Sequence, residues 1–240
     1  MLFDIIRNGL TAETLIQLLF FFLTFFITIT VHECAHGYIA YKMGDPTAKL
    51  MGRLTLNPVK HLDPIGFIMI LLIGFGWAKP VMINPRNFRN PKKGMALSAL
   101  AGPAANILMA ILGSLLFAIL RRVFSAAGIN NAVAASALSF LYYFEMLNVW
   151  FAVFNLLPIP PLDGSRLVSY FLPPRLHYYY NYVERYGFLI LILLLNIGRI
   201  SAYIPIFRYL DVLSGLQFIA GAIQSGIDFA VKSIFRLFGG

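Results

Sequence analysis

The sequence predicts an all-α polytopic membrane protein, a bundle of about five or six transmembrane helices with a re-entrant or extended segment near residues 64–83. Two observations support this expectation. Of the 240 residues, 59% are hydrophobic and only 12% are charged, which is about half the charged fraction of an ordinary soluble domain. The apolar residues also gather into long runs, several of which reach the roughly 20 residues that a helix needs to cross a bilayer.

The apolar runs define the expected spans. One further stretch, 212–235, contains two glutamines and an aspartate, so it could lie at the membrane interface or pack inside the bundle. The runs leave no room for an added soluble domain, and we expect one integral membrane domain over 1–240, with a core at about 16–172 and C-terminal helices over 187–240. The runs of spanning length are 15–42, 95–120, 133–157 and 187–206.

The run 64–78 differs from these. It is short, it follows Asp63, it begins with a proline, and it contains three glycines, all of which favour a re-entrant or broken segment over a straight span. Lys and Arg residues flank it on both sides, and they can all lie in the cytoplasm only if the chain enters the membrane and returns on the same side. These basic residues are Lys42, Lys49, Arg53 and Lys60 before the run and Lys79, Arg86, Arg89, Lys92 and Lys93 after it.

The charge distribution indicates a membrane surface as the partner. The net charge is +9, but the basic residues lie in short loops between apolar runs, as expected beside a negatively charged bilayer. We therefore expect the lipid bilayer as a partner and no nucleic acid. The sequence leaves the oligomeric state open.

The HECAH motif at residues 32–36 lies inside the first expected span. On a helix, His32 and His36 share one face about 6 Å apart, so both imidazoles can reach one tetrahedral Zn²⁺. Glu33 is rotated by about 100° and is close enough to accept a proton from a metal-bound water. Thr24 and Thr28 continue the same polar stripe, which should face the protein interior or a wet cavity. The alternative is a set of buried residues satisfied by their neighbours, but ionisable groups within a span are costly and usually functional.

A zinc hydrolase usually keeps three protein ligands and one water, so a third ligand is needed. Asp163 follows three closely spaced prolines just beyond the run 133–157, where the helix must end, and Gly164 permits a tight turn back toward the histidines. Glu145 lies deeper, in the middle of its span. Asp163 could instead cap the next helix, but the need for an acidic partner favours the ligand role.

Two further polar residues each allow more than one interpretation. Asn148 lies seven residues before Asn155 on the same helical face, where support of the metal site and plain helix packing are equally compatible with the pattern. His61 could support or gate the site from the loop before Pro64, or could cap a turn there. Residues 79–83 are typical of an extended segment that can pair with another strand.

These motifs, taken together, resemble the site-2 protease family of intramembrane zinc metalloproteases. The likeness covers roughly residues 16–172 and is closest to the compact members without PDZ or CBS domains. The motifs occur in the family's order: HECAH at 32–36, GRLTLNPVKHLDPIG at 52–66, AGPAAN at 101–106 and FNLLPIPPLDG at 154–164.

The resemblance implies a catalytic site and a substrate class. It implies a zinc ion held by His32, His36 and Asp163, with Glu33 as general base and Asn155 holding the scissile carbonyl or its oxyanion. The implied substrates are membrane-anchored proteins. We therefore expect a multi-pass protein of the cell membrane that hydrolyses peptide bonds within or near the bilayer, with its active site near the cytoplasmic face.

Two alternatives from other classes remain at the level of the sequence. One is a metal-dependent membrane hydrolase that uses the same ligands on a lipid. The other is a non-catalytic metal or ion transporter, in which the polar residues line an ion path; Glu145, in the middle of a span, is the residue that favours it.

Overall fold

The computed structural model describes residues 11–73, 76–200 and 212–237, and within these ranges the protein is helical with no sheet. One isolated antiparallel β-bridge joins Leu62 and Ala78. The elements in chain order are α2 (Ala12–Lys42), α3 (Thr47–Leu50), η1 (Pro58–Lys60), α4 (Pro64–Ile73), η2 (Pro85–Asn87), α5 (Pro91–Ala126), α6 (Ala132–Asn155), α7 (Asp163–Phe171), α8 (Pro174–Ile200) and α9 (Val212–Leu237).

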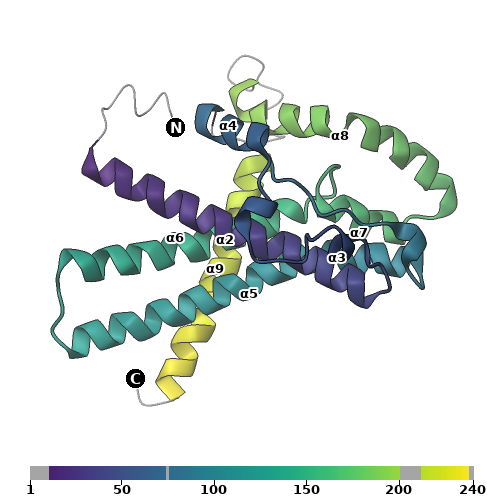
Figure 1. Ribbon diagram of the computed structural model, residues 1–240. Helices are drawn as coiled ribbons and strands as arrows, with labels where there is room; N and C mark the ends of the chain where they lie inside the picture. Colours follow the sequence, from purple (N-terminus) through teal and green to yellow (C-terminus); the bar gives the residue numbers. More distant parts are fainter. Residues whose placement is uncertain (1–10, 74–75, 201–211, 238–240) are drawn as a thin grey trace.

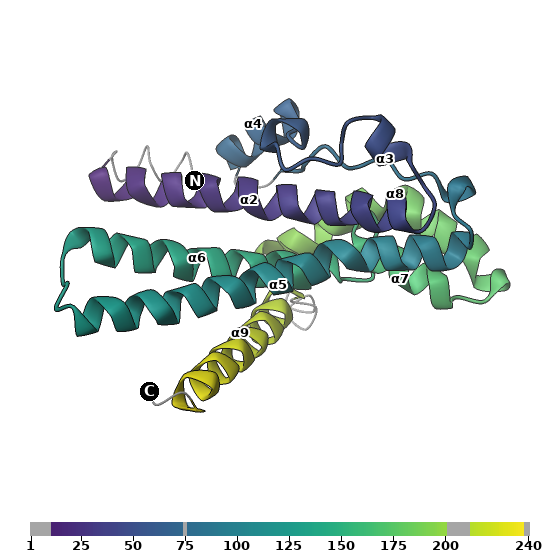
Figure 2. The same ribbon diagram turned by 60° about the horizontal axis from the view of Figure 1, so that its bottom comes forward.

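Three long helices, α2, α5 and α6, run side by side and form the body of the molecule (Figures 1 and 2). Each begins at a polar side chain that satisfies the free N–H groups of the first turn. These capping side chains belong to Thr11, Asn90 and Asn131, and they accept hydrogen bonds from the backbone N–H three residues later. The beginnings of the helices are therefore set by local sequence, while their apolar surfaces drive the packing.

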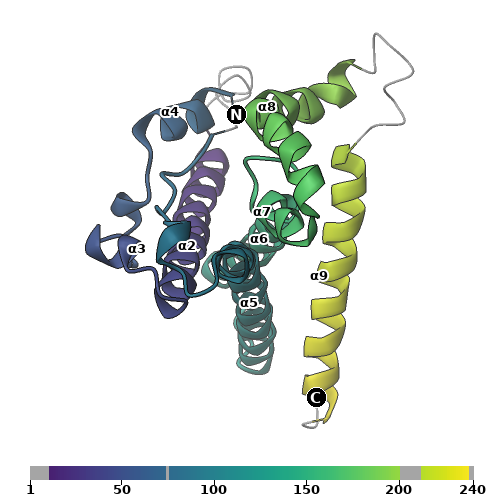
Figure 3. The same ribbon diagram turned by 90° about the vertical axis from the view of Figure 1, so that its right-hand side faces the viewer.

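Within the described residues, four helices are long and apolar enough to cross a membrane: α2, α5, α6 and residues 213–235 of α9. The expected spans 15–42, 95–120 and 133–157 thus correspond to long apolar helices, and the ambiguous stretch 212–235 is also helical. Unlike the other three, α9 crosses α5 and α6 steeply (Figure 3).

The expected span at 187–206 is described only in part. Its first part belongs to α8, which begins earlier, at Pro174, and the described part of α8 is not among the four candidates. The described apolar part of α8 lies between Arg185 and Arg199, and the predicted run continues beyond Arg199. Residues 201–206 lie outside the described part of the chain. The described residues therefore give four candidate spans where the sequence predicted about five or six.

The run 64–78 forms a hairpin-like excursion. Helix α4 has ten residues, about 15 Å of helix, which is half the thickness of a bilayer core. The two ends of the run meet again, because Leu62 bridges to Ala78 and the Lys79 N–H donates to the His61 carbonyl at 2.9 Å. The chain path is thus that of a segment that leaves and returns to one place, as a re-entrant segment does.

Glycines make this return possible. A methyl group on Gly66 would overlap the backbone of Trp77, and one on Gly76 would overlap the backbone of Gly66. The two sides of the excursion approach so closely that a Cβ would separate them. Gly66 and Gly76 are therefore required by close backbone approach.

Candidate metal centre

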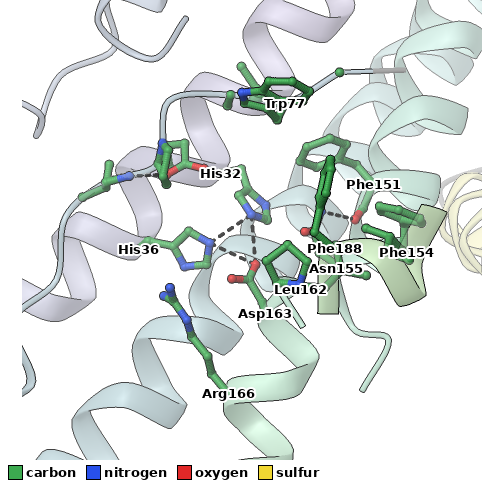
Figure 4. Close-up of a pocket in the computed structure, with 18 of the residues that line it drawn as sticks. His32, His36, Trp77, Phe151, Phe154, Asn155, Leu162, Asp163, Arg166 and Phe188 are labelled. Carbon is green, nitrogen blue, oxygen red and sulfur yellow. Dashed lines mark hydrogen bonds and ion pairs between the residues drawn. The ribbon is translucent and has the colours of Figure 1, made fainter. Parts of the chain in front are cut away.

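Two helices bring three ligand atoms together. The Nε2 atoms of His32 and His36, one turn apart on α2, lie 2.9 Å from each other. Asp163 is the first residue of α7, and its Oδ2 lies 3.1 Å from His32 Nε2 and 3.0 Å from His36 Nε2. Figure 4 shows the three side chains converging on one point, and their ligand atoms all lie within 4.8 Å of one another. The residue that caps α7 is Leu162, without a side-chain bond, so Asp163 does not act as that helix's cap.

The second nitrogen of each imidazole is held by α5. The Nδ1–H of His32 donates to the Asn106 side-chain carbonyl at 2.5 Å, and the Nδ1–H of His36 donates to the Ser98 backbone carbonyl at 2.6 Å. These bonds leave the Nε2 lone pairs facing Asp163, which is the orientation that metal-binding histidines need. Asn106 belongs to the AGPAAN motif, but the sequence alone gave it no role.

Asn148 supports the site through Asn106. The Asn106 amide donates to Asn148 Oδ1 at 3.0 Å, and Asn148 in turn donates to the carbonyl of Phe144 on its own helix. Both asparagine side chains are fully buried. Asn148 therefore does not contact the histidines itself and is linked to His32 through Asn106.

Glu33 lies beside the cluster in the same cavity of about 580 Å³. One carboxylate oxygen, Oε2, accepts a 2.8 Å hydrogen bond from the backbone N–H of Val81. The segment 76–83, which follows the excursion through α4, forms one wall of the cavity, and Phe151 and Asn155 of α6 line it as well. The hydrogen bond holds one oxygen of the Glu33 carboxylate, and no hydrogen bond to the other oxygen is seen among the described residues.

The structure places Asn155 in this cavity and His61 outside it. The Asn155 amide donates one N–H to the Phe151 carbonyl at 2.9 Å, and an amide has a second N–H to offer. His61 is fully buried and donates from Nε2 to the Thr55 carbonyl at 2.9 Å. Within the described residues, no hydrogen bond links His61 to the three clustered residues, and its contacts hold the loop instead.

Arg166 is a cavity residue that sequence reasoning missed. It lies one turn after Asp163 on α7, lines the cavity, and points toward the cluster in Figure 4. The sequence did carry a signal for Arg166, because residues i and i+3 on a helix share a face.

Burial raises the pKa of the Asp163 carboxyl, but hydrogen bonds with the two histidines outweigh burial and hold that pKa below its ordinary value.

These residues fit a zinc ion. Two imidazoles and one carboxylate form a usual donor set for a zinc hydrolase, which keeps a fourth position open. Gly102 of α5 lies directly behind the two rings, and a Cβ there would lie 2.6 Å from the Cε1 atoms of both histidines. The absence of a side chain at this position gives the rings the room that they occupy.

Comparisons with known proteins agree with this geometry. The model of peptidase family M50 matches residues 120–195. A relative from Bacillus subtilis, named "Putative zinc metalloprotease YwhC", is 42% identical over 72% of this chain and 78% of its own length. The chain belongs to peptidase family M50. This is the site-2 protease family of zinc metalloproteases, so the resemblance seen in the sequence is confirmed.

Two further relatives of this M50 chain are also named as zinc metalloproteases, Rip2 as a putative one. Rip2 of Mycolicibacterium smegmatis is 32% identical over 70% of this chain and 63% of its own length. The zinc metalloprotease MJ0392 of Methanocaldococcus jannaschii is 24% identical over 90% of this chain and 52% of its own length. No solved structure matches the chain.

Proposed function

We propose that this M50 protein is an intramembrane zinc endopeptidase that hydrolyses peptide bonds of membrane-anchored proteins within or near the bilayer. The observation that carries the proposal is the convergence of His32, His36 and Asp163 beside Glu33, in one cavity lined in part by α2 and α6, two helices of spanning length. A metal site alone would be compatible with transport. A carboxylate held next to it, with one oxygen free, is the arrangement that hydrolysis requires.

The chain's own residues supply acid–base chemistry and positioning. Zinc, when bound by the three ligands, would polarise a carbonyl and make water nucleophilic near neutral pH. Glu33 would remove a proton from the attacking water and deliver it to the leaving amine as the C–N bond breaks. The second N–H of Asn155 would stabilise the negative charge that develops on the carbonyl oxygen.

The surroundings of the site suit an apolar peptide in a membrane. Aromatic and aliphatic side chains line most of the cavity, among them Phe25, Ile29 and Phe154. The basic loops on both sides of α4 would face the cytoplasm under the positive-inside rule, which would place the active site near that face. Water would then enter from the cytoplasm, while the substrate would enter from the bilayer.

The test is the variant Glu33→Gln in detergent-solubilised protein. Metal analysis should find about one zinc per chain, because the variant keeps all three ligands. Cleavage of a library of single-span peptides, followed by mass spectrometry, should fall by about 10³–10⁴-fold, the upper range for a positioned acid–base group. Glu184→Gln, which removes an exposed carboxylate on α8, is the matched control and should cleave as the wild type does.

Two results would contradict the proposal. Near-wild-type cleavage by Glu33→Gln would remove Glu33 from the mechanism. A zinc-loaded wild type that cleaves no peptide in the library, but releases products from lipids, would assign the site to lipid hydrolysis.

A further inference from the structure

The metal cavity has one charged residue that the proposed proteolysis does not use. Arg166, on α7, is the basic side chain of its lining within the described residues, and it points toward the metal ligands (Figure 4). Most of the remaining lining is apolar, and in such pockets a few placed polar groups select the ligand. Arg166 is therefore placed to recognise the molecule that occupies the cavity.

Arg166 has no partner for its charge within the described part of the chain. No hydrogen bond or ion pair joins its guanidinium to a described residue, and Asp163, three residues earlier, pairs with His32 and His36 instead. Arg166 also lies in the first turn of α7, where the helix dipole favours anions over cations, so helix stability does not explain a cation here. Its N–H donors remain free for a ligand.

The first turn of α7 holds Arg166 and Asp163 at a fixed spacing. The Ser165 hydroxyl donates to the Leu162 carbonyl at 2.6 Å, and the Tyr180 hydroxyl of α8 donates to the Ser165 carbonyl at 3.0 Å. On a helix, Cβ atoms three residues apart lie about 5–6 Å from each other, and an extended peptide advances about 3.3 Å per residue. A peptide whose scissile bond lies at the metal site would thus bring a group about two residues away to Arg166.

Charge indicates which group this is. With zinc bound, the positive charge of the ion balances Glu33 and Asp163, and the charge of Arg166 remains unbalanced among the described lining residues. A guanidinium binds a carboxylate through a pair of parallel N–H···O bonds, which are stronger than bonds to a neutral amide. One carboxylate on the peptide would therefore complement the cavity in charge and in geometry.

We propose that Arg166 binds a carboxylate of the substrate about two residues from the scissile bond, and so makes the protease selective for peptides with an acid there. The inference rests on the proposed proteolysis for the reaction, but it names a determinant of specificity that the reaction itself does not need. The carboxylate can belong to an acidic side chain or to the free C-terminus of a peptide. Both sources have the same chemistry, and peptide binding distinguishes them.

Binding is measured on the zinc-loaded Glu33→Gln variant, so that peptides are not consumed. The reference is a fluorescently labelled apolar peptide with several glutamines and an amidated C-terminus. One set of peptides replaces each glutamine in turn by glutamate, and a further peptide has a free C-terminus. We expect at least one carboxylate peptide to bind about tenfold tighter than the reference by fluorescence anisotropy, the effect of about one charge-assisted hydrogen bond. Equal dissociation constants for all peptides would overturn the proposal.

Substitutions assign the preference to Arg166. In the same background, Arg166→Gln should bring the ratio of the two dissociation constants close to one, and Arg166→Glu should favour a lysine in place of the glutamate. Arg175→Gln, which changes an exposed arginine of α8 outside the cavity, is the matched control and should keep the ratio. Zinc content reports whether each variant is folded. An unchanged ratio in zinc-loaded Arg166→Gln, with or without a general loss of affinity, would refute the proposal.

This binding measurement does not depend on cleavage, so it separates the inference from the proposed function. A protein that shows the expected preference but cleaves no peptide would refute the proteolysis and support the carboxylate site. Cleavage of peptides without any preference for a carboxylate would refute the role of Arg166 alone.

Discussion

Replacement of Asn106 by leucine tests how the metal centre is oriented. The change keeps the side-chain volume nearly constant but removes the oxygen that accepts the His32 Nδ1–H at 2.5 Å. Without that acceptor, His32 can rotate or adopt the other tautomer, in which Nε2 carries the proton and cannot bind a metal. Loss of a hydrogen-bond partner behind a metal ligand usually lowers metal affinity about 10–100-fold, or about 1.4–2.7 kcal/mol.

The same substitution should also lower stability. The Asn106 amide donates to Asn148 Oδ1 at 3.0 Å and to the Thr28 carbonyl at 3.3 Å, and both acceptors would lose a donor inside the protein. The Thr28 carbonyl lies inside α2 and keeps its helical hydrogen bond, so the cost of about 1–3 kcal/mol for a buried group left unpaired applies to Asn148 Oδ1. Asn148→Leu removes only the outer member of this chain of bonds, so its effect on zinc affinity should be smaller than that of Asn106→Leu.

Zinc affinity would be measured by competition with a fluorescent chelator, and unfolding by a thermal melt in the same detergent. Asn196→Leu is the control, since the Asn196 amide donates to Ile192 on its own helix α8. We expect the loss of zinc affinity to be largest in Asn106→Leu, smaller in Asn148→Leu and smallest in the control. A folded Asn106→Leu variant with wild-type zinc affinity would refute the role of Asn106 in orienting His32.

Three further outcomes are expected. Gly102→Ala should lose most of its zinc by metal analysis, because the new methyl group would overlap both imidazole rings. Gly221→Ala is the control and should keep its zinc, since the space around Gly221 is open. Equal zinc contents in the two variants would contradict the packing argument. Asn155→Ala should lower peptide cleavage about 10²–10³-fold, the usual effect of losing one oxyanion donor, and kinetics that change in KM alone would assign it to binding. Single cysteines at Thr55 and Asn87, in a background without the native cysteine, should react alike with an impermeant reagent added from outside, and labelling of only one would show that the intervening run crosses the membrane.

The sequence was most informative where a local rule applied. The i, i+4 spacing of His32 and His36 predicted that both rings share one face, and the prolines before Asp163 predicted a chain that ends its helix and turns back. The structure brings these three residues together. The glycines of the run 64–78 likewise indicated the broken path that its ends now show.

What the sequence missed depends on contacts between distant segments. Periodicity shows which face of α2 is polar, but it does not name Asn106, 74 residues away, as the partner of His32, or Val81 as the partner of Glu33. The steep crossing of α9 follows from packing against α5 and α6, which no local pattern encodes. The end of the span expected at 187–206 stays a prediction, because residues 201–206 lie outside the described part of the chain.

The segment 76–83 beside Glu33 is also shielded from unwanted association. Exposed backbone edges can recruit a second chain and start aggregation, and a proline blunts such an edge because it has no N–H. Pro80 lies in the middle of the segment, and the N–H groups of Lys79, Val81 and Asn84 already donate within the protein. Among the described contacts, the N–H groups at positions 76–78 and at positions 82 and 83 make no hydrogen bond, and residues 79–81 separate these two short runs. The edge is therefore open to a short stretch of partner chain but offers no continuous template for the growth of a β-aggregate.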